Sequence, residues 1–210
     1  MSEITDVKVI GLTGQSGAGK TTVCEVFRDN GFAIINADQV SRLVLQKGHP
    51  CLQEVLEAIP EATLDSNGDI DRKKLGDLVF RDRGKLNLLT SISFPHITAL
   101  ILQEILRYAD EGEKWILLDA PTLFESRADD FCQLIISVLA DENVRLKRIM
   151  ERDRLSEVQA RNRLNSQHED SFYIDNSDFI IKNNKGIILL REKAKEVSDK
   201  IKEYYDAKEA

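Results

Sequence analysis

Apolar residues follow two different spacings along the chain, and the first spacing marks short buried strands. Apolar runs of strand length stand at residues 7–13, 32–36, 114–119, 134–139 and 178–181. Between several of these runs the apolar residues recur at helical spacing, as at Val23, Val26 and Phe27. Strands that alternate with helices predict an α/β fold around a central parallel sheet with right-handed crossovers.

The alternation stops at residues 39–110, where apolar residues keep the helical spacing alone. Leu52, Val55 and Ile59 form one such stripe, and further helices are expected on both sides of Pro95. We therefore expect a helical insertion at the edge of the sheet where ligands bind. Insertions at that edge usually carry the second substrate.

A glycine-rich segment lies between the first strand and the first helix, with the sequence Gly14-Gln15-Ser16-Gly17-Ala18-Gly19-Lys20-Thr21. It matches the phosphate-binding pattern G-x-x-x-x-G-K-[ST]. The glycines allow backbone N–H groups to point at one anion, and the following helix adds its positive end. Lys20 can reach the outer phosphates, and the Thr21 hydroxyl can bind Mg²⁺. We expect residues 14–22, through Thr22, to hold a nucleoside triphosphate rather than to form a plain turn.

Composition limits the classes of partner. The net charge of −7 argues against non-specific binding to nucleic acid or to anionic membranes. The three cysteines have no paired spacing, which favours free thiols in a reducing compartment. The sequence shows no signal peptide and no apolar run of membrane-spanning length. We expect a cytoplasmic monomer or weak homo-oligomer with no nucleic-acid or membrane partner.

Two aspartates follow predicted strands. Ligands of parallel sheets bind at the carboxyl ends of the strands, so Asp38 is a candidate active-site carboxylate. It could equally cap a helix that starts at Gln39, and both roles can hold together. Asp119 follows the apolar run Trp115–Leu118 and is a candidate ligand for Mg²⁺, directly or through water. The alternative for Asp119 is a turn residue at the end of a strand.

Arginines gather just after the fourth strand. Arg145, Arg148 and Arg152 are spaced i, i+3 and i+7 and share one helical face. In an acidic chain this face fits a clamp for the charge on a transferring phosphoryl group. The alternative is a solvated helix whose arginines pair with neighbouring carboxylates.

The ordered set of motifs resembles the dephospho-coenzyme A kinase family over nearly the whole chain. The matching positions are residues 11–21, 36–38, 48–50, 68–72, Leu75, Val79, Phe80, 94–95, 121–125, 145–153, Gln167, Asp178 and Asn183. The resemblance implies ATP-dependent phosphorylation of the ribose 3′-hydroxyl of dephospho-CoA, with Mg²⁺. It implies Asp38 as the base, Lys20 and Arg148 at the phosphates, and Asn183 beside the adenine.

The resemblance also implies a P-loop three-layer fold with three parts. The nucleotide-binding core would comprise residues 1–47, 111–144 and 176–210. The helical substrate domain would comprise residues 48–110, and the helical lid residues 145–175.

The chain departs from the family pattern at several positions. Asn36 replaces the first Asp of Asp-x-Asp, Phe94 replaces the His of His-Pro, and Thr122 replaces a Leu. Arginines usual after the lid glutamine are missing, and that region holds His168, Glu169, Asp170 and Tyr173. Part of the phosphate clamp would then be weaker or come from elsewhere.

Three other functions compete with this reading. The nearest is another small-molecule or nucleoside monophosphate kinase of the same fold. A GTP-binding switch usually carries Asn-Lys-x-Asp, whereas Asn184-Lys185 is not followed by that Asp. The third is a folded but inactive relative of the kinases.

Overall fold

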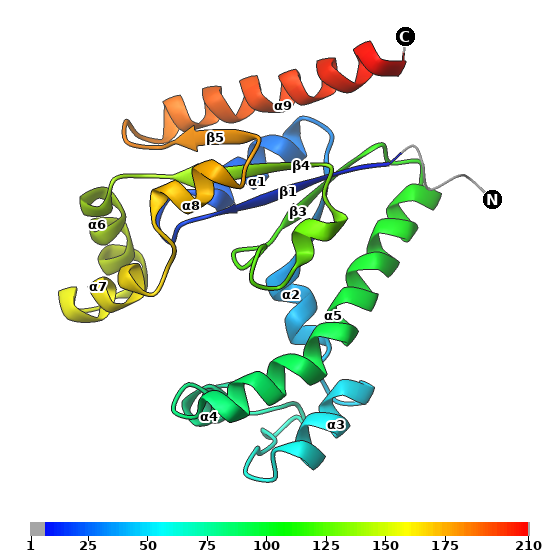
Figure 1. Cartoon of the computed structure of the whole chain (residues 1–210), viewed down its shortest axis with the longest axis vertical. Coiled ribbons are helices and arrows are strands. Elements are labelled where there is room, and N and C mark those ends of the chain that lie inside the picture. Colours follow the sequence, from blue (N-terminus) through cyan, green and yellow to red (C-terminus); the bar gives the residue numbers. More distant parts are fainter. Residues whose placement is uncertain (1–6, 210) are drawn as a thin grey trace. The chain divides into compact units, whose positions relative to one another are not determined.

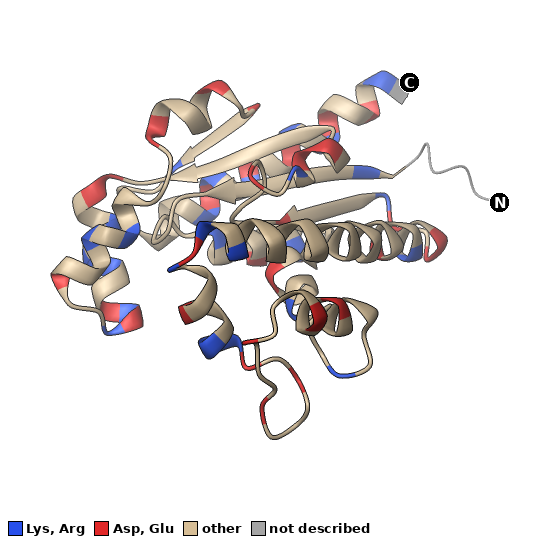
Figure 2. Cartoon of the chain, turned by 60° about the horizontal axis from the view of Figure 1, so that its bottom comes forward, with Lys and Arg blue, Asp and Glu red and all other residues tan. Residues whose placement is uncertain are grey.

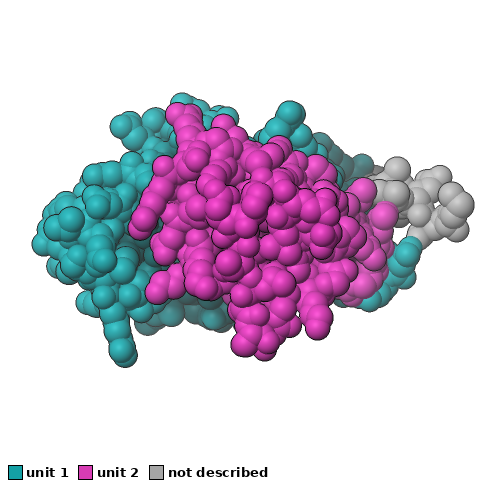
Figure 3. All heavy atoms as spheres, turned by 90° about the horizontal axis from the view of Figure 1, so that it is seen from below, with its two compact units in different colours: residues 1–35, 108–210 teal, residues 36–107 magenta. Residues whose placement is uncertain are grey.

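The structure is a computed structural model that describes residues 7–209 of the chain, and it contains two compact units. Among the described residues, the first unit comprises 7–35 and 108–209, and the second comprises 36–107 (Figure 3).

A five-stranded sheet with the order β2-β3-β1-β4-β5 organises the first unit. Its strands are β1 (Lys8–Gly14), β2 (Ala33–Asn36), β3 (Trp115–Asp119), β4 (Leu134–Leu139) and β5 (Phe179–Lys182). The pairs β1–β3, β1–β4 and β4–β5 are parallel. Each strand lies within one residue of an apolar run in the sequence, which confirms the predicted α/β fold.

Two helices, α1 (Lys20–Asp29) and α9 (Ile187–Glu209), cover one face of this sheet (Figure 1). Val23 and Phe27 of α1 are fully buried in one cluster with Ala194 and Ile201 of α9. Burial of a large apolar side chain contributes about 1.5–3 kcal/mol, so this cluster fixes α1 against the strands. The first helix ends at Asp29, before Gly31 with its positive φ of 79°.

A short 3₁₀ turn, η2 (Ala128–Phe131), leads into β4, and three helices separate β4 from β5. These are α6 (Glu142–Asp153), α7 (Glu157–Asn165) and α8 (Asp170–Asp175). α6 and α7 pack through a small cluster that includes Ile149 and Ala160. Ser156 and Gln159 form a capping box that starts α7. Figure 1 shows α6 and α7 beyond the carboxyl end of β4.

The second unit is helical around a core of its own. Its helices are α2 (Ala37–Leu43), α3 (Pro50–Ala58), α4 (Arg72–Val79) and α5 (Arg83–Asp110), the last of which ends in the first unit. The core comprises Val44, Cys51, Leu52, Val55, Ile59, Ile70, Leu75 and Val79. The Nδ1 atom of His49 accepts a hydrogen bond from the Cys51 N–H at 3.2 Å and caps α3.

The prediction of separate helices on either side of Pro95 is wrong. Pro95 lies inside the single 28-residue helix α5. A proline inside a helix removes one backbone hydrogen bond and costs about 3 kcal/mol. Leu89 and Ile92 before Pro95, and Ile97 and Leu100 after it, all pack against the core of the second unit. This packing on both sides stabilises one continuous helix.

α5 also differs from the expectation that no apolar stretch reaches membrane-spanning length. An 18-residue window of α5 has a mean hydropathy of 1.3, enough by length and composition to cross a membrane. One such helix is weak evidence for a span, because the core helix of a globular protein passes the same test. Part of this helix packs against the core of the second unit, and 17% of the window is buried; the residues that pack there are Leu86, Leu89, Ile92, Ile97 and Leu100.

Candidate functional site

The phosphate loop leaves the carboxyl end of β1 beside β4. Gly14 pairs with Val138 in the sheet, and the Gln15 N–H donates to the Val138 carbonyl at 3.2 Å. Gly14 has φ 131°, and a Cβ there would come within 2.2 Å of the Val138 carbonyl oxygen. Only glycine fits a position that combines this φ with this approach of backbone to backbone. The start of the loop therefore depends on the pairing of Gly14 in β1 with Val138 in β4.

Lys20 is the first residue of α1, and its side chain turns back over the start of the loop. Its Nζ atom donates to the Gly14 carbonyl at 2.7 Å and lies 3.5 Å from the Gln15 carbonyl. Thr21 and Thr22 complete the first turn of α1. The N-cap residue, Gly19, gives that helix no side-chain cap. An uncapped helix start with a lysine beside it is suited to bind an anion.

Asn183 and Arg148 contact the other half of the loop. The buried Asn183 Nδ2 donates to the Ala18 carbonyl at 2.7 Å, and Arg148 Nη1 donates to the Gly17 carbonyl at 3.2 Å. Arg148 Nη2 also lies 3.4 Å from Asn183 Oδ1. A cavity of about 470 Å³ opens here, lined by Gly17, Gly19, Arg148, Glu151 and Arg152. The structure thus brings these two predicted residues to the loop.

Sequence reasoning missed the loop's contacts with Gln167 and with Asp170, the first residue of α8. Gln167 Oε1 accepts a hydrogen bond from the Ser16 N–H at 2.9 Å. Gln15 Nε2 donates to Asp170 Oδ1 at 2.7 Å. Gln167 stood out only through the family resemblance, and Asp170 only as a departure from it. No local pattern signals a contact across 151 or 155 residues.

Asp119 ends β3 directly beside Leu12 of β1. Its carboxylate acts on the buried Cys24 thiol in α1. Burial raises the pKa of Cys24 most, Asp119 raises it further, and Lys20 lowers it. Asp119 and Lys20 therefore both lie near this thiol.

Thr21, in the first turn of α1, and Asp119, at the end of β3, carry oxygen atoms that would suit a magnesium ion. The Thr21 hydroxyl and the Asp119 carboxylate are ligands of the kind that Mg²⁺ prefers. Within residues 7–209, no group of three or more His, Cys, Asp or Glu side chains could hold a metal by itself. Magnesium in nucleotide sites usually takes one or two protein ligands and completes its shell with phosphate and water.

Asp38 is an exposed residue of α2 in the second unit. The alternative role of Asp38, as the cap of a helix starting at Gln39, is wrong. The helix starts at Ala37, and Asn36 caps it by accepting a hydrogen bond from the Gln39 N–H at 2.9 Å. The pKa of Arg72 is lowered by burial and by Arg42, and raised by Asp38. Asp38 therefore lies within electrostatic reach of a cationic pair in its own unit.

The arginines of α6 and α7 fall into two classes according to what they contact. Arg152 pairs with Asp153 at 2.7 Å, and the nearby Arg161 pairs with Glu157 at 2.8 Å and with Glu142 at 3.4 Å. Figure 2 shows both signs of charge interspersed over these helices. These arginines behave as parts of a solvated surface, where ion pairs contribute about 0–1 kcal/mol. Arg148 contacts the loop instead.

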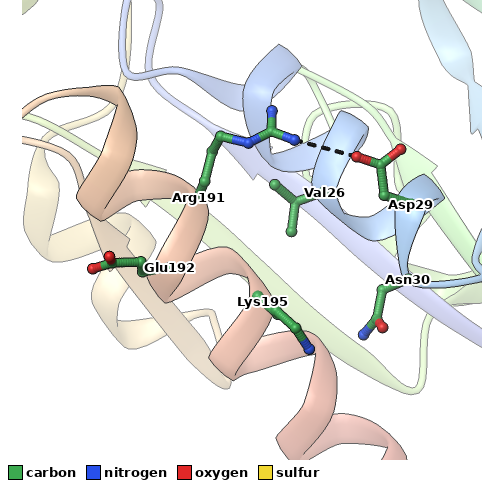
Figure 4. A pocket seen from close by; sticks show the side chains of 6 residues that line it. All are labelled: Val26, Asp29, Asn30, Arg191, Glu192 and Lys195. Atoms are coloured by element: carbon green, nitrogen blue, oxygen red, sulfur yellow. Dashed lines mark hydrogen bonds and ion pairs between the residues drawn. The ribbon is translucent and has the colours of Figure 1, made fainter.

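A separate cavity of about 300 Å³ lies between α1 and α9 (Figure 4). Its lining residues are Val26, Asp29, Asn30, Arg191, Glu192 and Lys195. Arg191 closes part of it through an ion pair with Asp29 at 3.2 Å. Because this cavity is at the C-terminal end of α1 and the phosphate loop is at the N-terminal end, we do not assign it to the nucleotide.

Comparison with known proteins agrees with this geometry. The model of the dephospho-CoA kinase family matches residues 8–188. A dephospho-CoA kinase from Oryza sativa is 37% identical over 94% of this chain and 86% of its own length. One from Carboxydothermus hydrogenoformans is 38% identical over 88% of this chain and 89% of its own.

Solved structures give the same result. The dephospho-CoA kinase from Campylobacter jejuni has a TM-score of 0.70 and 29% identity, covering 92% of this chain and 96% of its own. A Thermus thermophilus protein has a TM-score of 0.79 and 25% identity, covering 92% and 97%. The family model matches residues 8–188, and the two relatives named above are 37% and 38% identical over most of this chain. The chain belongs to the dephospho-CoA kinase family.

Proposed function

We propose that this protein transfers the terminal phosphoryl group of ATP to the ribose 3′-hydroxyl of dephospho-CoA, giving coenzyme A and ADP. The observation that carries the proposal is the family match over residues 8–188, which includes the phosphate loop and both residues that contact its second half. The relatives from Oryza sativa and Carboxydothermus hydrogenoformans are named for this activity.

Phosphoryl transfer needs little covalent chemistry from the protein, so positioning and charge stabilisation dominate. In our proposal residues 14–22 cradle the phosphates, and Lys20 and Arg148 offset their negative charge. Asn183 holds the nucleoside end of ATP. Support comes from Lys20 at the start of the loop and Arg148 and Asn183 at its second half.

Asp38 is the proposed base. It orients the acceptor hydroxyl and accepts its proton. An ordinary carboxylate is a weak base for an alcohol, so the proton moves late, when bond formation to phosphorus has made the hydroxyl acidic. Asp38 lies within electrostatic reach of Arg72, which is itself within electrostatic reach of Arg42.

Thr21 and Asp119 would hold Mg²⁺ in this proposal. When bound, the ion offsets charge that develops on the phosphate oxygens. The position of Thr21 in the first turn of α1 and of Asp119 at the end of β3 supports this assignment.

The three-part organisation follows from these roles. We assign residues 1–47, 111–144 and 176–210 to the nucleotide-binding core, 48–110 to the substrate domain and 145–175 to a lid that excludes water. Residues 36–47 of this functional core belong to the second compact unit. A lid that closes over ATP limits its hydrolysis before the acceptor arrives. We further propose a cytoplasmic monomer or weak homo-oligomer.

The test is ATP turnover against dephospho-CoA, adenosine, nucleoside monophosphates, shikimate and no acceptor. We expect turnover with dephospho-CoA alone. Asp38→Asn should reduce kcat about 10²–10⁴-fold, the usual contribution of a general base. Asp77→Asn is the matched control, because Asp77 is an exposed carboxylate of α4 in the same unit.

Each other outcome points to one of the rivals. Turnover with a nucleoside monophosphate or another acceptor would keep the phosphate site and overturn the proposed substrate. Tight ATP binding without turnover on any acceptor would favour the inactive relative.

A further inference from the structure

A polar cavity of about 670 Å³ opens beside Gln15 of the phosphate loop, with no lining residue in common with the cavity that Arg148 lines. Its lining residues are Gln15, Asp141, Glu142, Arg145, Leu164, Asn165, Gln167, His168, Glu169 and Asp170. All of them belong to the first unit. Gln15 and Gln167 fix one wall through the loop contacts described above.

Arg145 lines this cavity and is unusual for an arginine. Its side chain is only 7% exposed, and its Nε atom donates to the Ala140 carbonyl at 2.9 Å. Its Nη1 atom is buried and has no hydrogen-bond partner among residues 7–209. Buried charges are normally paired and hydrogen-bonded, because leaving them unmatched is costly.

Asp170 and Glu142 are the carboxylates that act on the charge of Arg145. Burial lowers the pKa of Arg145, while Asp170, Glu142 and Tyr173 raise it. Asp170 receives a hydrogen bond from Gln15, and Glu142 is bound by Arg161. The structure shows no ion pair between Arg145 and any described carboxylate. An anion in the cavity would complete the coordination of the guanidinium.

The position of this cavity along the phosphate loop indicates which anion would bind there. The ammonium group of Lys20 lies at Gly14 and Gln15. This lysine of the motif reaches the outer phosphates of a nucleotide. Asn183 and Arg148 contact the opposite half, at Ala18 and Gly17. The cavity beside Gln15 is therefore at the outer-phosphate end of the loop.

We propose that Arg145 binds the terminal phosphate of the nucleoside triphosphate and so lets the enzyme distinguish a triphosphate from a diphosphate. The inference rests on the proposed function only in requiring that the loop hold the nucleotide. It is independent of the acceptor. Arg145 is on the buried side of α6, whereas the exposed Arg152 is paired with Asp153.

Isothermal titration calorimetry tests this directly, with ADP and a non-hydrolysable ATP analogue as the two probes. Arg145→Gln should weaken binding of the analogue about 10–100-fold, the range for a charge-assisted hydrogen bond. Its affinity for ADP should change less than about twofold. Arg145→Lys keeps the charge and should retain part of the preference. Arg163→Gln should change neither affinity, because Arg163 is an exposed arginine paired with Asp153 at 2.7 Å and lies outside the lining of this cavity.

Thermal melting of each variant separates recognition from support of the fold. Equal losses for ADP and the analogue, together with a lower Tm in Arg145→Gln and Arg145→Lys, would show a purely structural role and overturn the inference. An unchanged preference for triphosphate would also overturn it. If the wild type binds both probes but does not phosphorylate dephospho-CoA, the proposed acceptor fails while the role of Arg145 is still decided by the titrations. If the wild type binds neither probe, the loop assignment and this inference fall together.

Discussion

Replacing Gly14 with alanine tests the argument that the strand register determines the phosphate loop. Gly14 has φ 131°, and an added Cβ would lie 2.2 Å from the Val138 carbonyl oxygen and 2.6 Å from the Val138 nitrogen. Both atoms belong to the backbone of β4, which is paired with β1 at this position. Neither can turn aside as a flexible side chain could.

The expected loss of stability has two parts. A positive φ costs an alanine about 1–2 kcal/mol. Overpacking against a rigid neighbour adds about 1–3 kcal/mol. The sum of about 2–5 kcal/mol corresponds to a fall in Tm of about 4–20 °C for a chain of this size, at roughly 2–4 °C per kcal/mol. The Gln15 N–H bond to Val138 would be strained as well, so nucleotide affinity should also fall.

Gly112→Ala is the matched control. Gly112 has φ 82°, and an added Cβ would meet nothing within 4 Å, so only the φ contribution applies. Differential scanning calorimetry of both variants separates the two parts. If Gly14→Ala melts at the same temperature as Gly112→Ala, the close approach to Val138 has no energetic weight and the argument for this glycine is wrong.

Two more predictions concern residues of the first unit. Gln167→Ala removes the acceptor of the Ser16 N–H and should weaken ADP binding about 2–10-fold, the range for one net hydrogen bond. Asn165→Ala leaves that bond intact and should not weaken ADP binding. If calorimetry gives both variants the same affinity for ADP, the Gln167–Ser16 bond does not support nucleotide binding. Burial raises the pKa of the Cys132 thiol from 9.0 to about 12. The folded state therefore keeps this proton when the unfolded state loses it, and the free energy of unfolding should fall as pH rises from about 9 to about 12. Urea unfolding at pH 8 and pH 10 measures this change. The free energy of unfolding should fall less between the two pH values in Cys132→Ala than in the wild type, and an equal fall in both proteins would contradict the prediction.

The strands and the phosphate loop were predictable because their signals are local. Each strand is an apolar run bounded by polar or glycine residues, and the loop is one continuous motif. Asp119 was placed by the same reasoning, as the residue that ends a buried strand. A local signal suffices where one stretch of chain supplies both the element and its chemistry.

Two local predictions failed because several weak preferences competed. Asn36 and Asp38 are both good capping residues, and only the helix start at Ala37 decides that Asn36 is the cap. Pro95 normally interrupts a helix, yet apolar packing on both sides of it maintains α5. In both cases tertiary context outweighed the preference of a single residue.

The roles of the three arginines on α6 illustrate what a sequence leaves open. Their spacing places them on one side of a helix and is silent on what that side meets. In the structure Arg145 is buried behind the loop, Arg148 reaches the Gly17 carbonyl, and Arg152 pairs with Asp153. These differences arise because α6 packs directly on the loop, where a Cβ at Gly17 would come within 3.0 Å of the Arg145 carbonyl. Residues that contact the loop from 131 to 165 positions away are therefore selected by the packing of the whole unit, and only coordinates separate such a residue from one in a surface ion pair.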